Sequence, residues 1–179
     1  MVAYDNNALE SQFLQGWLLQ DRYLMRSPLG IVYEVLWANP YQPGLSYFHL
    51  PLTYRDAKRQ GGGLLLRSSW EDDAVMFTYV DGKAQVFEDG KRKTLELARI
   101  EKPLRVGDAA VLSSWKFKAE LPLYYVTGLK AGGLYDVEID GEEMKEMQAD
   151  AGGILELTFA AGVHGSVRIH PAKSGAPKS

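Results

Sequence analysis

The sequence predicts a mainly β protein, an antiparallel β-sandwich with one or two N-terminal helices packed against it. Short apolar segments alternate with turns from residue 64 onwards, a spacing typical of sandwich proteins. Asp-Gly pairs supply the positive-φ residues that tight hairpin turns need. These pairs are Asp81-Gly82, Asp89-Gly90 and Asp140-Gly141. The apolar fraction of 46% is sufficient for a hydrophobic core.

Residues 8–25 have the spacing of an amphipathic helix. Leu9, Phe13 and Trp17 recur at every fourth position, so a helix would place them on one apolar stripe. Residues 31–38 fit either a short helix or a strand, and we favour the helix. We expect the helix of 8–25 to pack on the sheet through its stripe.

The remaining elements follow in chain order. We expect an extended segment at 45–52 and a polar linker at 54–63, which ends in a mobile glycine loop. The expected strands are 64–69, 74–80, 84–88, 93–99, 110–113, 123–128, 134–139, 143–148, 154–159 and 165–170. In the strand 134–139, the alternating residues Tyr135, Val137 and Ile139 are expected to face inward.

Three regions are expected along the chain. Residues 1–44 form a helical segment and an aromatic loop, residues 45–171 form the sandwich, and residues 172–179 form a disordered tail. The softest part of the β-region is 102–122, which is where we place any subdivision. The sandwich region accounts for most of the chain.

Composition excludes several function classes. The net charge is −3 and no region is strongly basic, so neither nucleic acid nor a membrane surface is expected as a partner. The apolar runs are too short to span a bilayer. The absence of cysteine excludes disulfides and thiolate metal sites. No secretory signal is visible, but both a piece of a longer protein and a free-standing chain fit the sequence, so the compartment stays open.

The residues that bind metals do not cluster in the sequence. The three histidines, His49, His164 and His170, are not within helix or strand spacing of one another. The acidic run 71–73 lacks the alternating pattern and glycine of calcium loops, so we interpret it as a solvated turn. We therefore expect no metal site and no cofactor.

A catalytic hypothesis rests on His49. It follows an aromatic pair, and a histidine beside tyrosines can act as acid or base in polysaccharide cleavage, here with Tyr47 and Glu71. The alternative is a half-buried histidine that bonds to the backbone, which we favour.

Aromatic side chains give a second kind of site, because a flat ring stacks on the apolar face of a pyranose. The candidates are Trp37, Tyr41, Tyr47, Trp70 and Trp115, with Arg67 beside Trp70 in the sequence. A place in the hydrophobic core is the alternative for each ring, and for each we favour it. The residues we expect to contact glycan are Trp37, Tyr41, Trp70 and Arg67.

The stretch RSSWEDDAVMFTYVDG, which begins at Arg67, resembles the β-sandwich part of heparinase II/III-like polysaccharide lyases. FLQGWLLQDRYLMRSP and WANPYQPGLSYFHLPL resemble the passage from the last helix of an (α/α) toroid into that region. YYVTGLKAGGLYDVEIDG and ADAGGILELTF are similar to small sandwich modules of carbohydrate-active enzymes. The resemblance implies kinship with the non-catalytic half, because residues 81–87 lack the histidine that those lyases carry and no toroid is present.

Three functions remain open from the sequence. We expect a non-catalytic sandwich module of a carbohydrate-processing protein, which supports a catalytic domain or binds glycan and is exported if its parent protein is. The first alternative is a small polysaccharide lyase or hydrolase that uses His49 and Tyr47. The second is an assembly module that docks on a partner through its N-terminal helix.

Overall fold

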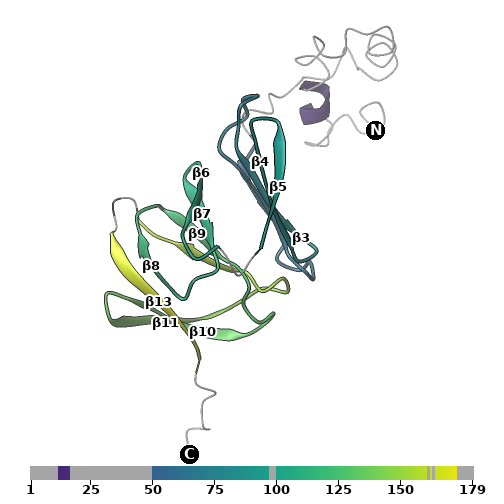
Figure 1. Cartoon of the computed structure of the whole chain (residues 1–179). Coiled ribbons are helices and arrows are strands. Elements are labelled where there is room, and N and C mark those ends of the chain that lie inside the picture. The colour runs from purple at the N-terminus through teal and green to yellow at the C-terminus, as the bar shows by residue number, and fades with distance from the viewer. Residues whose placement is uncertain (1–11, 17–49, 97–99, 161, 163, 173–179) are drawn as a thin grey trace, which may run out of the picture. The chain divides into compact units, whose positions relative to one another are not determined.

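The computed structural model describes residues 12–16, 50–96, 100–160, 162 and 164–172 (Figure 1). The chain divides into two compact units, Met1–Pro51 and Leu52–Ser179. In the first unit, residues 12–16 are helical and lie inside the helix expected at 8–25. The expected second helix, the aromatic loop and residues 45–49 of the expected extended segment lie outside the described residues. No described helix is long and apolar enough to cross a membrane.

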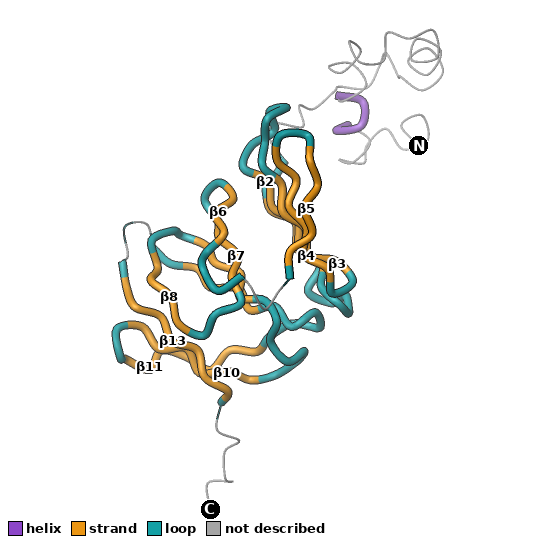
Figure 2. Tube along the Cα trace, viewed as in Figure 1, coloured by secondary structure: helices purple, strands orange, loops and turns teal. Residues whose placement is uncertain are grey.

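The second unit is mainly β and is built from antiparallel sheets (Figure 2). Its described strands are β1 (Thr53–Arg55), β2 (Gly63–Arg67), β3 (Met76–Val80), β4 (Lys83–Glu88), β5 (Lys91–Leu95), β6 (Leu104–Val106), β7 (Ala109–Leu112), β8 (Lys116–Ala119), β9 (Leu123–Val126), β10 (Leu134–Ile139), β11 (Glu142–Gln148), β12 (Leu155–Thr158) and β13 (Gly165–Pro171).

These strands form three sheets. One has the order β1-β2-β3-β4-β5, and the other two have the orders β11-β10-β13-β8 and β12-β9-β7-β6. Among the described pairs, β7 and β9 alone run parallel, which corrects the expectation of wholly antiparallel sheets. The connection from β7 to β9 passes through β8 in the neighbouring sheet, and this crossover makes the parallel pairing possible.

The three Asp-Gly pairs form the expected tight turns. Asp81, Asp89 and Asp140 have φ angles of 52°, 50° and 53°, and the glycine after each also has a positive φ. Two consecutive positive-φ residues define the hairpin turn whose twist matches that of the flanking strands. The sequence therefore correctly predicts the β3–β4, β4–β5 and β10–β11 hairpins.

Each expected strand from 64–69 onwards overlaps a strand of the structure, but β1, β6 and β8 were not expected. β1 lies at the start of the expected linker 54–63 and pairs with β2, so the prediction of a linker there is wrong. β6 and β8 lie in the stretch 102–122, together with β7, whose side chains are all buried. The unexpected strands are only three or four residues long, which leaves too few positions for a period of two to be recognised.

One hydrophobic core extends through the second unit. In β10, Tyr135 and Val137 are buried and Ile139 is half-buried, as the alternation predicts. Phe117 of β8 and Tyr124 of β9 belong to the two four-stranded sheets, and their ring centroids lie 4.8 Å apart. The two sheets therefore contact each other through large aromatic side chains.

Candidate functional site

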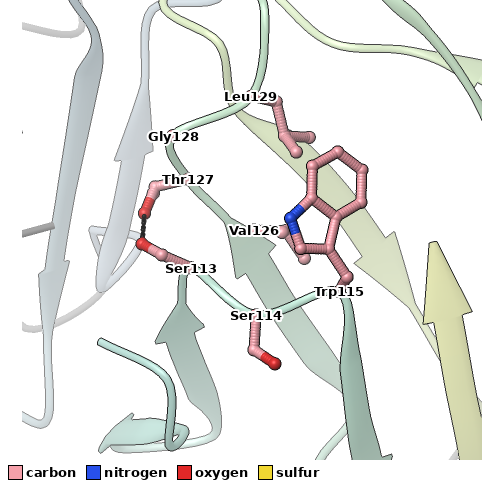
Figure 3. Close-up of a pocket in the computed structure, with 7 residues that line it drawn as sticks. All are labelled: Ser113, Ser114, Trp115, Val126, Thr127, Gly128 and Leu129. Atoms are coloured by element: carbon pink, nitrogen blue, oxygen red, sulfur yellow. Dashed lines mark hydrogen bonds between the residues drawn. The ribbon is translucent and has the colours of Figure 1, made fainter. Parts of the chain in front are cut away.

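A groove forms where β7 and β9 end. Because parallel strands end at the same edge of a sheet, the segments 113–115 and 127–129 lie side by side there (Figure 3). The groove has a volume of about 240 Å³. Its lining residues are Ser113, Ser114, Trp115, Val126, Thr127, Gly128 and Leu129. None of these side chains is ionisable.

Hydrogen bonds hold the polar side of this groove in place. The hydroxyl oxygens of Ser113 and Thr127 lie 2.9 Å apart, as Figure 3 shows. Thr127 Oγ1 also lies 3.3 Å from the carbonyl oxygen of Leu112, to which it donates. The Ser114 hydroxyl donates to the carbonyl of Lys116 at 2.8 Å. The groove is therefore organised before any ligand arrives, which lowers the entropic cost of binding.

Trp115 forms one wall of the groove and is 44% exposed. Its ring centroid lies 5.6 Å from that of Tyr135, with 48° between the planes. The indole N–H has no hydrogen-bond partner within the described part of the chain. Trp115 therefore does not belong to the core: Tyr135 supports it from one side, while solvent reaches the rest. A supported, accessible indole can stack on a ring and donate one hydrogen bond.

The turn from β2 to β3 brings together two of the expected glycan residues. The guanidinium carbon of Arg67 lies 4.8 Å from the ring centroid of Trp70, and Arg67 Nε donates to the carbonyl of Ser69 at 3.0 Å. Ser68 Oγ accepts a hydrogen bond from the backbone N–H of Val75 at 2.9 Å. Because these groups bond to one another, the turn is better explained as the entrance to β3 than as a ligand site.

The other expected site residues do not converge within the described chain. Glu71 is exposed in the same turn, whereas His49, Tyr47, Trp37 and Tyr41 lie outside the described residues. Among the described residues, no group of three or more histidine, aspartate or glutamate side chains is placed to hold a metal ion.

A buried ion cluster centred on Arg55 was not predicted from the sequence. From β1, Arg55 Nη1 lies 2.6 Å from Glu156 Oε2, and its Nη2 lies 3.0 Å from Asp150 Oδ2. The other carboxylate oxygen of Asp150 accepts hydrogen bonds from the backbone N–H groups of Gly152, at 2.9 Å, and Ile154, at 2.8 Å. Asp150 and Glu156 are 95 and 101 positions away from Arg55 in the sequence, so no local sequence pattern reveals the cluster.

The cluster shifts the pKa values of its members. Burial lowers the pKa of Arg55, but the hydrogen bonds and charges of Glu156 and Asp150 outweigh it, so the pKa is raised. Burial, followed by the charge of Glu156, raises the pKa of Tyr125 to about 12. Burial and the charge of Asp150 raise the pKa of Tyr79. Arg55 stays charged and Tyr125 neutral at neutral pH, so the cluster is a structural joint rather than a proton-transfer site.

No family model, curated protein or solved structure matches this chain. The function must therefore be argued from the geometry of the chain's own residues.

Proposed function

We propose that this chain is a non-catalytic β-sandwich module of a carbohydrate-processing protein and that the Trp115 groove binds a glycan. The observation that carries the proposal is the exposed indole of Trp115 beside a groove of fixed hydroxyls. The proposal includes a sandwich arrangement of the two four-stranded sheets, N-terminal helices packed on it, and kinship with the sandwich region of heparinase II/III-like lyases.

The size of the groove limits what it can hold. Its volume of about 240 Å³ lies below the range of roughly 300–1,000 Å³ that is usual for drug-sized ligands. One sugar unit, with its apolar face on the indole, suits this space. The chain would thus hold a polysaccharide at single rings rather than enclose an oligosaccharide.

The second part of the proposal is the partner. A module that binds one sugar unit weakly gains from an adjacent catalytic domain, because linked sites raise the effective concentration of the polymer. We therefore propose that the module belongs beside such a domain in an exported protein. The catalytic alternative is not carried by the described residues, because Glu71 lies in an exposed turn and its expected partners His49 and Tyr47 lie outside them.

Affinity electrophoresis tests the proposal directly. The whole chain is run through gels containing alginate, a heparin-like polymer or a neutral glucan, together with Trp115→Ala. We expect at least one polymer to retard the wild-type chain, and we expect the same polymer not to retard Trp115→Ala. Tyr54→Ala is the matched control, because Tyr54 is an aromatic residue, 65% exposed, that does not line the groove. If no polymer retards the wild-type chain, glycan binding is excluded.

A Trp70→Ala variant separates the two candidate sites. If Trp70→Ala abolishes retardation while Trp115→Ala retains it, the β2–β3 turn is the glycan site and the assignment of the groove is wrong.

A further inference from the structure

The sheet β11-β10-β13-β8 has one face in the core and one in solvent. Side chains alternate between the faces, so the neighbours of the buried residues Phe117, Tyr135, Val137, Val167 and Ile169 point outward. We call this solvent side the outer face. Its charged residues are Lys116, Lys118, Asp136, Glu138, Glu146, Arg168 and His170.

The charges on the outer face are separated by sign. Lys116 of β8 stands directly opposite Arg168 of β13, and Lys118 is on the same strand as Lys116. Asp136 of β10 stands directly opposite Glu146 of β11. Like charges that face each other across neighbouring strands destabilise a sheet. At the boundary between β10 and β13, Arg168 stands directly opposite Glu138. The β8–β13 half of the face therefore carries an excess of positive charge and the β10–β11 half an excess of negative charge.

Few of these charged side chains form an ion pair within the sheet. Where the two halves meet, His170 Nε2 lies 3.6 Å from Glu138 Oε2, and the two form an ion pair only when the histidine is protonated. Lys116, Lys118 and Arg168 form no ion pair with any described residue. Leu134, at the start of β10, has the same alternation as Asp136 and is 48% exposed, so the face also presents an apolar side chain.

We propose that the outer face binds the outer face of a second copy of this chain. A two-fold axis in the plane of contact, along the boundary between β10 and β13, would place the positive half of each copy against the negative half of the other. This self-complementary arrangement is the requirement of an isologous dimer. A hollow of about 460 Å³ lies beside the positive half, and its lining includes Lys116 and Lys118 together with the carboxylate Asp140. A carboxylate of the partner copy would be received at the lysine side of this hollow.

The size of the face sets the expected strength. Four strands spaced about 4.8 Å apart give a width of roughly 19 Å, and the strand lengths give a similar height. The flat area is then about 400 Å² per copy, against about 800 Å² for a standard stable interface. The dimer is therefore weak, and its dependence on charge makes it sensitive to salt.

Sedimentation velocity on the whole chain tests this inference. We expect a concentration-dependent dimer at about 20 mM salt, which dissociates at about 500 mM salt because the charges are screened. A wild-type chain that stays monomeric at low salt, up to the highest concentration reached, would overturn the inference.

Charge exchange provides the specific control. Lys116→Glu with Arg168→Glu gives the face a large excess of acidic residues, with Lys118 kept, and Asp136→Lys with Glu146→Lys gives it a large excess of basic residues, with Glu138 kept. Each variant alone is expected to be monomeric, whereas an equimolar mixture is expected to form a heterodimer. The matched control is Lys91→Glu with Arg92→Glu, which reverses two positive charges on exposed residues of β5, outside the outer face. This control should dimerise as the wild type does. If the mixture stays monomeric, the outer face is not the interface.

A single substitution separates folding from association. Lys116→Glu places opposite charges across β8 and β13, so it should raise the urea midpoint of the monomer while weakening the dimer roughly tenfold. A lower midpoint together with a weaker dimer would indicate simple damage to the fold and would count against the inference. The test does not involve glycan, so its result is independent of the proposed function.

Discussion

Arg55 shows how one side chain joins distant parts of the chain. Its guanidinium on β1 reaches Asp150, after β11, and Glu156 on β12. Asp150 is 5% exposed in its side chain, so removing either partner would leave a poorly solvated charge. Breaking such a buried pair costs about 3–5 kcal/mol in other proteins. The cluster thus links β1 of the five-stranded sheet to β12 and to the segment after β11.

Tyr125 predicts a loss of stability at high pH. Burial and the nearby Glu156 raise its pKa from 10.0 to about 12 in the folded protein. Between these values the unfolded chain releases the proton and the folded protein keeps it. The contribution of Tyr125 to the free energy of unfolding is therefore complete below about pH 10. As the pH rises towards 12, this contribution is lost and the free energy of unfolding falls by about 2 kcal/mol.

Urea unfolding at a series of pH values from about 9 to about 12 measures this loss of stability. Tyr125→Phe should flatten the decline, while Tyr54→Phe, which removes an exposed hydroxyl, should leave it unchanged. An equal slope in the wild type and in Tyr125→Phe would refute the role assigned to Tyr125.

At the scale of single residues, the sequence shows which side chains have suitable chemistry for a site, but it does not show whether those side chains are exposed or packed. It includes Trp115 among five rings suited to sugar but does not select it for glycan contact, because the exposure of Trp115 and its packing on Tyr135 are set by the fold. It marks Arg67 and Trp70 as a pair, and they do contact each other, yet their contact closes a turn. The Arg55 cluster is set by tertiary contacts, which no local spacing encodes.

At the scale of elements, the glycine turns carry the clearest prediction. Gly82 and Gly153 have nearly equal φ angles of 71° and 73°. A Cβ on Gly82 meets nothing within 4 Å, whereas a Cβ on Gly153 would collide with the carbonyl oxygen of Leu129. We expect Gly82→Ala to cost about 1 kcal/mol and Gly153→Ala about 3 kcal/mol.

Because the two glycines share the strain of a positive φ, the difference between the variants isolates the close approach of the backbone. Denaturant midpoints measure both variants. Equal losses of stability would show that the approach of the loop 150–153 to Leu129 is unimportant. Leu129 also lines the Trp115 groove, so Gly153→Ala should weaken glycan binding as well.

The elements that the sequence predicts are those with local causes. Asp-Gly turns and alternating strands such as β10 are determined by φ preferences and side-chain alternation over a few residues. β8 is held by pairing with the distant strand β13, as in the register of Phe117 opposite Val167. β1 and β6 pair with the strands that follow them in the chain, but three residues are too few to show an alternation. The parallel pairing of β7 and β9 likewise follows from chain topology, which local patterns do not report.

At the scale of the whole molecule, the spacing of short strands and the Asp-Gly turns correctly predict a mainly β chain, but the arrangement of sheets depends on long-range contacts. The second unit contains three sheets around one core. The Trp115 groove exists because the crossover through β8 brings the ends of β7 and β9 together. The candidate site is therefore a product of topology, and the sequence predicts only its aromatic residue.

The most direct test of the central claim is an NMR titration of the tryptophan indoles. The chain has four tryptophans, so the indole N–H region is simple, and a Trp115→Phe spectrum assigns the signal of Trp115. On titration with the oligosaccharides of any polymer that retards the chain, we predict that the Trp115 indole signal shifts in a saturable way while that of Trp70 stays in place. A Trp115 signal that remains unchanged while another indole shifts would contradict the account.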